Sequence, residues 1–476
     1  MKKNAFIKIG CLLSVITLLN VIWVTEKGEL PLKRTLLSVV IALVLGIVIY
    51  ILECKVKITF REILGKDVFR KKSYTRQGLK VFDILALLAV FALSVFVRYK
   101  AFYFESPDYE IFWDKWIDQF RSIGWHSLGC NIGDYPPLYT EILISLSMTG
   151  MSKMLISKLI PIVFDYVLGI VGVMMYEELK KEHTIHGKVI VFASIILNPV
   201  VVLNSAVWGQ CDVIYSSFIL MSVLILIRII NGKKVQSELV LVFFSIALCF
   251  KLQAILSFPF ILFYMTIQKK KDVKITQLVW IPVIYIVTAL PMLFAGRATS
   301  DVLLAYANQT GQYSSFLNMR YHNFYDLIGV SVFDIKDSYY ALGMMLAVAI
   351  VGLIYYFCWK KDVKITSEKI VLLGAFTVAT LAFFLPSMHE RYAFVAEMLI
   401  LILALICKKY IIPALLTFIC TIITYGDYLS ADAFDITLEW KIVIALVRLS
   451  VIAYMTYVIF ISKDEKQKQN GECPEN

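Results

Sequence analysis

The sequence has few charged residues and no long polar stretch. Asp, Glu, Lys and Arg make up 17% of its 476 residues, while hydrophobic residues make up 59%. Soluble globular domains have nearer one quarter charged and one half apolar residues. With a mean hydropathy of +0.75, this composition leaves no room for a sizeable soluble domain and places the chain in lipid.

Other signals are missing too. The nine cysteines lie mostly inside apolar runs, without a CxxC pair or metal-ligand spacing, so no metal site is predicted. A bridge between Cys130 and Cys211 is left open. The formal charge of +11 comes from basic residues spread over short connections, not from a patch interleaved with aromatics. This distribution argues against nucleic acid as a partner.

Apolar runs of about 18 residues, each long enough to cross a bilayer as a helix, recur from end to end. They predict an all-α polytopic membrane protein with about 14 transmembrane helices. The first run follows Lys2 and Lys3 but lacks a small-residue cleavage site, so we expect a retained span. The expected spans are 5–24, 32–53, 80–99, 154–176, 188–205, 212–231, 238–250, 254–267, 276–294, 338–359, 369–386, 391–407, 410–427 and 440–462.

Basic residues mark every second connection, and by the positive-inside rule those connections and both termini face the cytoplasm. Lys33 and Arg34 are an exception. The alternation requires residues 137–150 to form an interfacial helix and residues 238–267 to form two short helices with a bend near Lys251. The marking residues are Lys71, Lys72, Lys180, Lys181, Lys233, Lys234, Lys269 to Lys271, Lys360, Lys361, Lys408, Lys409 and Lys463.

This topology places the unexpected polar groups together on the extracytoplasmic side. Acids that face basic groups suit a transfer from a phosphate-linked donor, because a carboxylate can take a hydroxyl proton and cations can stabilise the leaving phosphate. The groups are Glu105, Asp108, Glu110, Asp114, Asp118 and Asp134 in one loop, Trp208 to Asp212 in a second, Lys251 and Gln253 at the bend, and His389 to Tyr392 in a third.

Each group also has a structural interpretation. Asp108 and Asp134 could cap the helices that follow them, and Trp208 and Tyr392 could be interfacial aromatics. Asp165, inside a span, is expected to make a structural hydrogen bond to a neighbouring helix. Lys251 is harder to explain in this way, because an unpartnered cation between apolar segments costs about 3 kcal/mol.

The motifs Asp108-Tyr109-Glu110, Asp134-Tyr135-Pro136-Pro137, Lys251-x-Gln253 and His389-Glu390, in this order, resemble those of GT-C class glycosyltransferases that use polyprenyl-phosphate sugars. The chain is most similar to the endoplasmic-reticulum glucosyltransferases and to bacterial relatives of the GPI-anchor mannosyltransferases. Trp208-Gly209-Gln210-x-Asp212 also resembles a motif of the bacterial members. The departures, such as Arg391 where the glucosyltransferases have lysine, concern the sugar and the acceptor.

The resemblance implies an inverting hexosyltransferase in which Asp108 is the base. It implies a GT-C-like catalytic module at 80–300. Residues 1–79 depart from the family by adding two spans and a basic loop before its usual start. The runs after the module predict a transmembrane module at 301–462 and a cytoplasmic tail at 463–476. No cofactor or metal is expected. The residues that would bind or position substrate are Glu110, Asp134, Tyr135, Trp208, Gln210, Asp212, Lys251, Gln253, His389, Glu390 and Arg391.

The expected partners are a polyprenyl-phosphate-sugar donor, a saccharide or glycolipid acceptor and the bilayer. Short loops and Lys- and Ile-rich spans favour a bacterial plasma membrane. Two other functions stay open. A transporter or flippase of lipid-linked saccharides would show paired broken helices in two related halves, and a non-catalytic assembly partner is the third alternative.

Overall fold

The computed structural model describes residues 67–69, 79–267, 272–306, 316–329, 337–430 and 436–461. These residues form an all-α fold with two short pairs of strands, β1 (Asp67–Phe69) with β2 (Leu79–Lys80) and β3 (Asn318–Met319) with β4 (Met388–His389). The first two expected spans, most of the basic segment after them and the tail lie outside the described residues.

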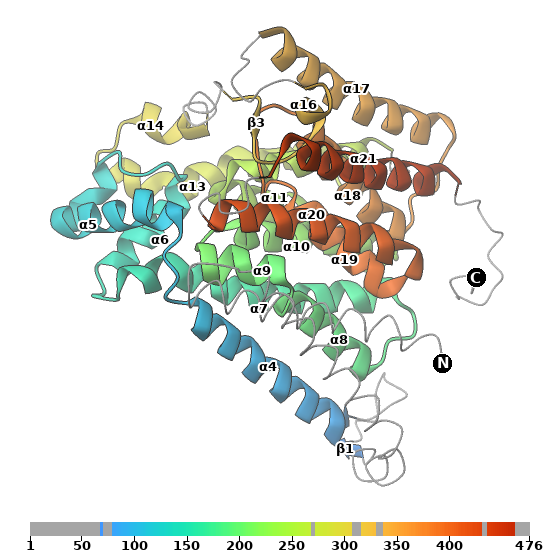
Figure 1. The fold of residues 1–476 in the computed structure, drawn as a ribbon, viewed down its shortest axis with the longest axis horizontal. Coiled ribbons are helices and arrows are strands. Elements are labelled where there is room, and N and C mark those ends of the chain that lie inside the picture. Colours follow the sequence, from blue (N-terminus) through green and yellow to red (C-terminus); the bar gives the residue numbers. More distant parts are fainter. Residues whose placement is uncertain are drawn as a thin grey trace.

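The helices follow one another along the chain with short connections (Figure 1). The first half contains α4 (Val81–Ala101), the π-helix η1 (Tyr109–Trp113), α5 (Asp114–Ile123), η2 (Gly124–Gly129), α6 (Pro137–Ser147), α7 (Lys153–Leu179), α8 (Ile185–Ile196), α9 (Pro199–Val202), the π-helix η3 (Leu203–Trp208) and α10 (Asp212–Ile230). The second half contains α11 (Leu239–Phe250), η4 (Leu252–Ser257), α12 (Phe258–Ile267), η5 (Ile275–Val279), α13 (Trp280–Phe294), α14 (Thr299–Leu303), α16 (Phe324–Leu327), α17 (Asp337–Lys360), α18 (Ser367–Phe384), α19 (Phe394–Ile406), η6 (Lys408–Tyr410), α20 (Ile411–Leu429) and α21 (Leu438–Ile461).

Eight helices of the described part are long and apolar enough to cross a membrane, or nine if the bent pair 185–196 and 199–208 counts as one span. The polytopic all-α membrane fold is therefore confirmed. Each expected span from residue 80 onward coincides with one of these helices or with the shorter apolar helices at 239–250, 252–267 and 394–406. The total of about 14 spans stays a prediction.

The helices differ in how much of their surface is buried. In the central helices α10 and α18, 72% and 78% of the most apolar 18-residue stretch is buried inside the protein. In α4, α13 and α17 the buried share of that stretch is only 17% to 22%. The exposed side chains of these three outer helices are nevertheless large and apolar, among them Leu88, Val287 and Val348. Water-soluble surfaces rarely tolerate apolar faces of this extent, so these helices form the surface that meets lipid.

A buried ion pair joins α4 to α7. Arg98 donates from Nε and from one terminal nitrogen to Asp165 Oδ2, at 2.9 and 2.7 Å, and Ser205 Oγ donates to the same oxygen at 2.6 Å. Both charged side chains are almost fully buried. The prediction that Asp165 bonds to a neighbouring helix is confirmed, and the contact fixes α4, from whose end the next loop begins.

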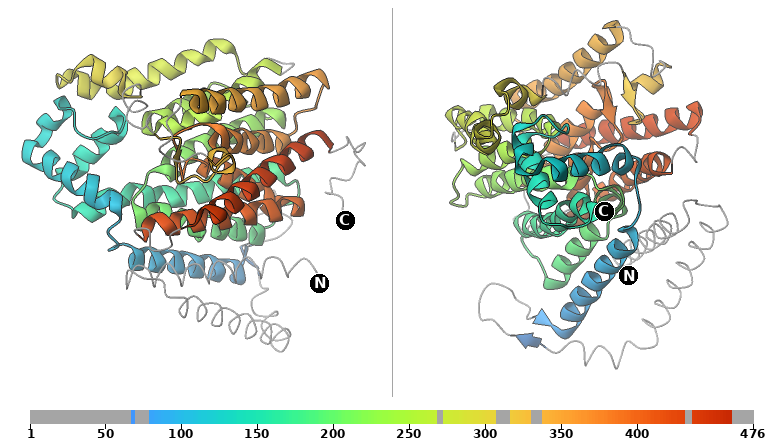
Figure 2. Two further views of the ribbon diagram at one scale, coloured as in Figure 1. Left: turned by 45° about the horizontal axis from the view of Figure 1, so that its top comes forward. Right: turned by 90° about the vertical axis from the view of Figure 1, so that its left-hand side faces the viewer.

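The connections predicted to be cytoplasmic meet at one end of the bundle. Glu178, at the end of α7, binds Arg228 and Lys233 at 2.9 and 2.8 Å, and Ser367 Oγ donates to Asn231 Oδ1 at 2.6 Å. The 19 residues of α10 separate this end from Asp212 by about 28 Å. The helices α5 and α6 lie beyond the Asp212 end (Figure 2, left). The basic end and the acidic end are thus opposite.

Helix α6 has Pro137 at its first position and only 11 residues, about 16 Å at 1.5 Å per residue. It is therefore too short to span the hydrocarbon core. Its N-cap residue is Pro136, without a side-chain cap, so the alternative in which Asp134 caps this helix is wrong. The interfacial position of α6 stays a prediction.

The opposite ends allow a direct test of sidedness. Glu110 and Asp134 are exposed at one end, and Lys181 and Lys361 are exposed at the other. In a cysteine-free protein, Glu110→Cys and Asp134→Cys are expected to react with an impermeant thiol reagent from outside intact cells. Lys181→Cys and Lys361→Cys should react only after permeabilisation. The opposite pattern would contradict an extracytoplasmic site. Positions 209 and 390 are unsuitable for labelling, because both are buried.

Candidate functional site

Asp108 immediately precedes η1, and three donors from distant segments surround its carboxylate. Trp208 Nε1 donates to Oδ2 at 2.8 Å, Gln210 Nε2 donates to the same oxygen, and the Tyr428 hydroxyl donates to Oδ1 at 2.5 Å. Asp108 is 7% exposed. It occupies the N-cap position of η1, but its side chain makes no capping bond. The capping interpretation is therefore wrong, and the carboxylate is held by side chains.

The turn that presents Trp208 and Gln210 is fixed by its backbone. The π-helix η3 ends at Gly209, whose φ of 79° is in the left-handed region that glycine adopts without strain. The backbone N–H of Gln210 then donates to the backbone carbonyl of Asn204 at 2.8 Å. Ser106 Oγ donates to the Trp208 carbonyl at 2.9 Å, so the loop before Asp108 is attached to the same turn. These bonds bring the first two motifs together.

Asp212, the first residue of α10, is fully buried in a cluster of polar side chains. Lys251 Nζ lies 2.8 Å from Oδ1, Arg391 Nε lies 3.5 Å from Oδ2, and Asn204 Nδ2 donates to Oδ2 at 3.0 Å. Burying a carboxylate is costly unless basic groups and donors surround it. These three partners supply that compensation. We call Asn204, Asp212, Lys251, Glu390 and Arg391 the Asp212 cluster.

Lys251 reaches the cluster because the helix breaks at its position. Its backbone is extended, with φ −158° and ψ 137°, between the end of α11 and the start of η4. The predicted interruption at Lys251 is confirmed. Lys251 Nζ also lies 3.5 Å from Gln210 Oε1, which links the Asp212 cluster to the donors around Asp108. Gln253, two residues on, is buried, and within the described structure its Oε1 makes no hydrogen bond.

The loop between α18 and α19 supplies His389, Glu390 and Arg391. An Arg391 terminal nitrogen binds Glu390 Oε1 at 2.6 Å, and the guanidinium lies 4.8 Å from the centroid of the Trp208 ring. Burial lowers the pKa of His389 well below 6.5, and Arg391 lowers it further. His389 is therefore neutral near pH 7. The expectation that it adds a positive charge for a phosphate is revised, since it can only donate or accept a hydrogen bond.

The carboxyl groups of the site outnumber its buried basic groups. Asp108, Asp212 and Glu390 face Lys251 and Arg391, and the bonds above already pair both basic side chains with carboxylates. Any anionic ligand would therefore have to compete with Asp212 and Glu390 for these cations. Within the described ranges, no three His, Cys, Asp or Glu side chains form a group suited to a metal ion.

Three residues of the site were not predicted. Tyr428 stacks on Trp208 with ring centroids 4.7 Å apart, in addition to its bond to Asp108. Arg320 lies 5.2 Å from the centroid of the Tyr428 ring, and one of its terminal nitrogens lies 3.3 Å from Asp427 Oδ2. The only sequence signal for Asp427 and Tyr428 is that they end an expected span on the same side as the motifs. Their contacts in the structure, and not their positions in the sequence, show that they belong to the site.

Three other predicted site residues, Glu110, Asp134 and Tyr135, have different surroundings. Glu110 and Asp134 are exposed, and no bond links Glu110 to the Asp108 donors or to the Asp212 cluster in the part of the chain described. Tyr135 packs among aromatic rings, stacked on Trp113 at 5.5 Å and perpendicular to Tyr139 at 4.9 Å. Their substrate contacts remain predictions. The structure does bring together Asp108, Trp208, Gln210, Asp212, Lys251, Glu390 and Arg391.

Comparison with known proteins adds no family to this picture. No family model matches the chain, and no curated protein matches it. The residues and their geometry therefore carry the functional argument.

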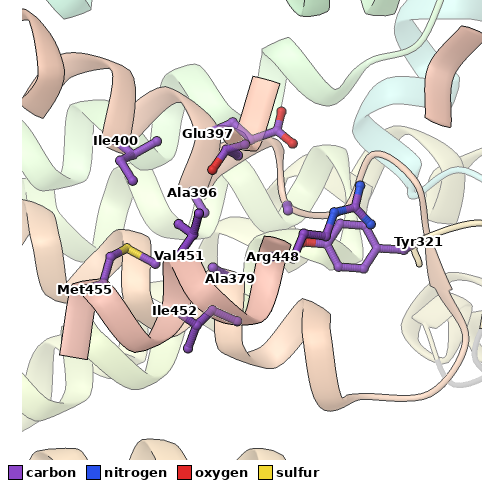
Figure 3. Close-up of a pocket in the computed structure, with 11 residues that line it drawn as sticks. Tyr321, Ala379, Ala396, Glu397, Ile400, Arg448, Val451, Ile452 and Met455 are labelled. Carbon is purple, nitrogen blue, oxygen red and sulfur yellow. The ribbon is translucent and has the colours of Figure 1, made fainter. Parts of the chain in front are cut away.

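A small pocket lies among α18, α19, α20 and α21. Arg448, Glu397 and Tyr321 line its polar end, whereas Ile400 and Met455 lie at its apolar end (Figure 3). The Arg448 guanidinium lies 3.8 Å from the centroid of the Tyr321 ring. The arginine thereby attaches α21 to the segment that carries Arg320.

Lys158 holds the loop before Asp108 in place by hydrogen bonds to its backbone. It lies in α7, is fully buried and donates to the carbonyls of Phe102 and Phe104 at 2.8 and 2.7 Å. Lys158→Met keeps the apolar stem but leaves both buried carbonyls without their donor, so we expect a loss of about 1–3 kcal/mol in unfolding free energy. If the protein is an enzyme that uses Asp108, its turnover should also slow, because Asp108 is no longer held in place.

Unfolding in detergent and turnover by the same preparation measure both effects. The matched control is Lys233→Met at the opposite end, where the lysine is exposed and Glu178 keeps Arg228 as a partner, so we expect a loss of less than about 1 kcal/mol. Unchanged stability together with unchanged turnover in Lys158→Met would contradict the positioning role.

Proposed function

We propose that this chain is an inverting glycosyltransferase that transfers a hexose from a polyprenyl-phosphate monosaccharide to a cell-envelope glycan or lipid-linked acceptor. One observation carries the proposal. Gln210 donates to Asp108 Oδ2, and its other amide atom lies 3.5 Å from Lys251 Nζ. A buried carboxylate able to take a proton and a basic group able to bind a phosphate are thus separated by a single side chain.

The chemistry follows from this arrangement. Trp208 and Gln210 both donate to Oδ2, whereas Tyr428 alone donates to Oδ1, so Oδ1 is the oxygen that can also take the proton of the acceptor hydroxyl. The hydroxyl oxygen then bonds to the anomeric carbon, and the bond from that carbon to the phosphate oxygen breaks. The electron pair leaves with the phosphate, whose charge Lys251 and Arg391 stabilise. Attack opposite the leaving group inverts the configuration of the anomeric carbon.

The position of the site supports a lipid-linked donor. The Asp108 residue and the Asp212 cluster lie at the end of the bundle opposite the basic connections. By the positive-inside rule this is the extracytoplasmic end, where a polyprenyl chain can stay in the bilayer while its sugar reaches Asp108. The proposal therefore places the reaction at the outer face of the plasma membrane, with both termini in the cytoplasm.

A transporter of lipid-linked saccharides is the second candidate, because two interrupted helices meet at the site. Helix α8 is followed by a 45° bend before α9, and the break at Lys251 separates α11 from η4. Broken helices are typical of transporter binding sites. Such sites lie near the bilayer midplane, whereas Asp212 begins α10 at the end of the bundle.

Purified protein in liposomes distinguishes the two functions. A synthetic polyprenyl-phosphate hexose with a labelled sugar is supplied with a mixture of envelope glycolipids. An enzyme is expected to release polyprenyl phosphate and to label a second molecule. A transporter would move intact donor across the bilayer, and transbilayer movement without release of polyprenyl phosphate would overturn the proposal.

A further inference from the structure

Arg320 has a backbone conformation that is unusual for its residue type. Its φ of 67° lies in the left-handed region, which residues other than glycine seldom adopt. The segment is fixed on both sides of it. The strand β3 pairs in parallel with β4, and Arg448 donates to the His322 carbonyl at 3.0 Å and covers the Tyr321 ring (Figure 3). A strained conformation held by its surroundings is typical of functional positions.

The side chain of Arg320 differs from the other cations of the site in its exposure. It is 37% exposed, compared with 6% for Lys251 and 12% for Arg391. Asp427 holds it at 3.3 Å. A guanidinium has five N–H donors in a planar fork, more than the one carboxylate of Asp427 can use. Arg320 is thus the most accessible of these three cations.

The location of Arg320 identifies which substrate it would meet. Gln210, on the Oδ2 side of Asp108, lies beside Lys251. On the Oδ1 side, Tyr428 lies beside Arg320. Inverting displacement places the leaving group and the attacking hydroxyl on opposite faces of the sugar. If Lys251 serves the leaving phosphate, Arg320 lies on the side from which the acceptor approaches.

We infer that Arg320 binds a phosphate group of the acceptor, so that the enzyme selects phosphate-bearing acceptors over neutral ones. This inference rests on the proposed function. Arginine forms paired, charge-assisted hydrogen bonds with phosphate oxygens, and the nearby Tyr428 hydroxyl marks where the acceptor hydroxyl would meet Asp108 Oδ1. The phosphate can belong either to the glycan of the acceptor or to its lipid linkage.

Transfer kinetics with matched acceptors test the inference. Glucose 6-phosphate represents a phosphorylated glycan, octyl glucosyl phosphate represents a lipid linkage, and glucose and octyl glucoside are their neutral counterparts. Arg320→Gln is expected to raise KM for one of the phosphate-bearing acceptors about 10- to 100-fold, with KM for the donor and for neutral acceptors unchanged. Arg320→Lys should recover only part of this loss, because lysine lacks the planar fork.

The matched control is Arg228→Gln, which removes an arginine from an ion pair with Glu178 at the opposite end of the bundle. It should leave every KM unchanged. An equal KM change for charged and neutral acceptors in Arg320→Gln, or no change for any acceptor, would overturn the inference while leaving the transfer reaction intact.

A binding measurement separates this inference from the proposed function. The protein is saturated with farnesyl phosphate to fill the donor site, and the two phosphate-bearing acceptors are then titrated by calorimetry. Binding that Arg320→Gln abolishes supports the phosphate subsite even if no transfer is detected, in which case only the proposed function fails. Equal binding by the wild-type protein and Arg320→Gln, or no binding by either, overturns the subsite.

Discussion

Asp108→Asn is expected to lower the transfer rate by about 100- to 10,000-fold, which is the usual contribution of a positioned general base. The amide is nearly the same size as the carboxylate but cannot take the acceptor proton. Its oxygen can still accept from Trp208 and Gln210, and the Tyr428 hydroxyl can rotate to accept from its nitrogen, so the fold should persist. The rate is measured with a synthetic polyprenyl-phosphate sugar, and donor binding is followed separately.

Two controls define the meaning of this result. Glu105→Gln removes an exposed acid from the same loop and should transfer sugar at the wild-type rate. Asp134→Asn should reduce the rate less than Asp108→Asn, since Asp134 is exposed whereas Asp108 is buried. If Asp134→Asn loses transfer while Asp108→Asn retains it, the base is Asp134. Full activity in both variants would remove the central residue of the mechanism.

Lys251→Met is expected to lower both donor use and stability. From the sequence alone, the loss of this cation should affect the donor phosphate without unfolding the protein. The structure changes that expectation, because Lys251 is the 2.8 Å partner of the fully buried Asp212. Removing one member of a buried ion pair costs about 3–5 kcal/mol. Arg391 and Asn204 still contact Asp212, which favours the lower end of this range.

The double variant Lys251→Met with Asp212→Asn separates the two effects. It removes the uncompensated carboxylate, so its stability in detergent should return toward that of the wild-type protein. Donor use should stay low, because the basic group for the phosphate is still missing. Wild-type stability and wild-type donor affinity in the single variant would contradict both roles of Lys251. A double variant that is no more stable than the single one would contradict the pairing.

The sequence predicted the helices well, for a physical reason. A bilayer requires apolar runs of a fixed length, so from residue 80 onward the apolar runs coincide with helices even where these are broken at Lys251. It also predicted that Asp108, the Trp208 turn, Lys251 and the Arg391 loop lie at one end, because alternating basic connections mark the opposite end. The hydrogen-bond partners within the site could not be predicted, because they depend on how side chains pack and not on which side of the membrane a loop lies.

Arg320 and Tyr428 illustrate that limit. Neither is among the predicted site residues, and Tyr428 only follows the end of an expected span. Their role emerges only when α20 packs against the turn at Trp208. Local structure explains a second difference. Glu110 is exposed although it is two residues from Asp108, because the π-helix η1 turns the two side chains toward different surroundings.

The bond between Asp108 and Tyr428 has a consequence for how the protein is made. It joins residues 320 positions apart, and a chain enters the membrane from its N-terminal side during synthesis. Asp108, Trp208 and Lys251 are therefore in the bilayer long before α20 arrives to donate to Oδ1. The newly made chain holds a partly assembled site until its last helices insert, so the donors around Asp108 and the membrane domain are completed together.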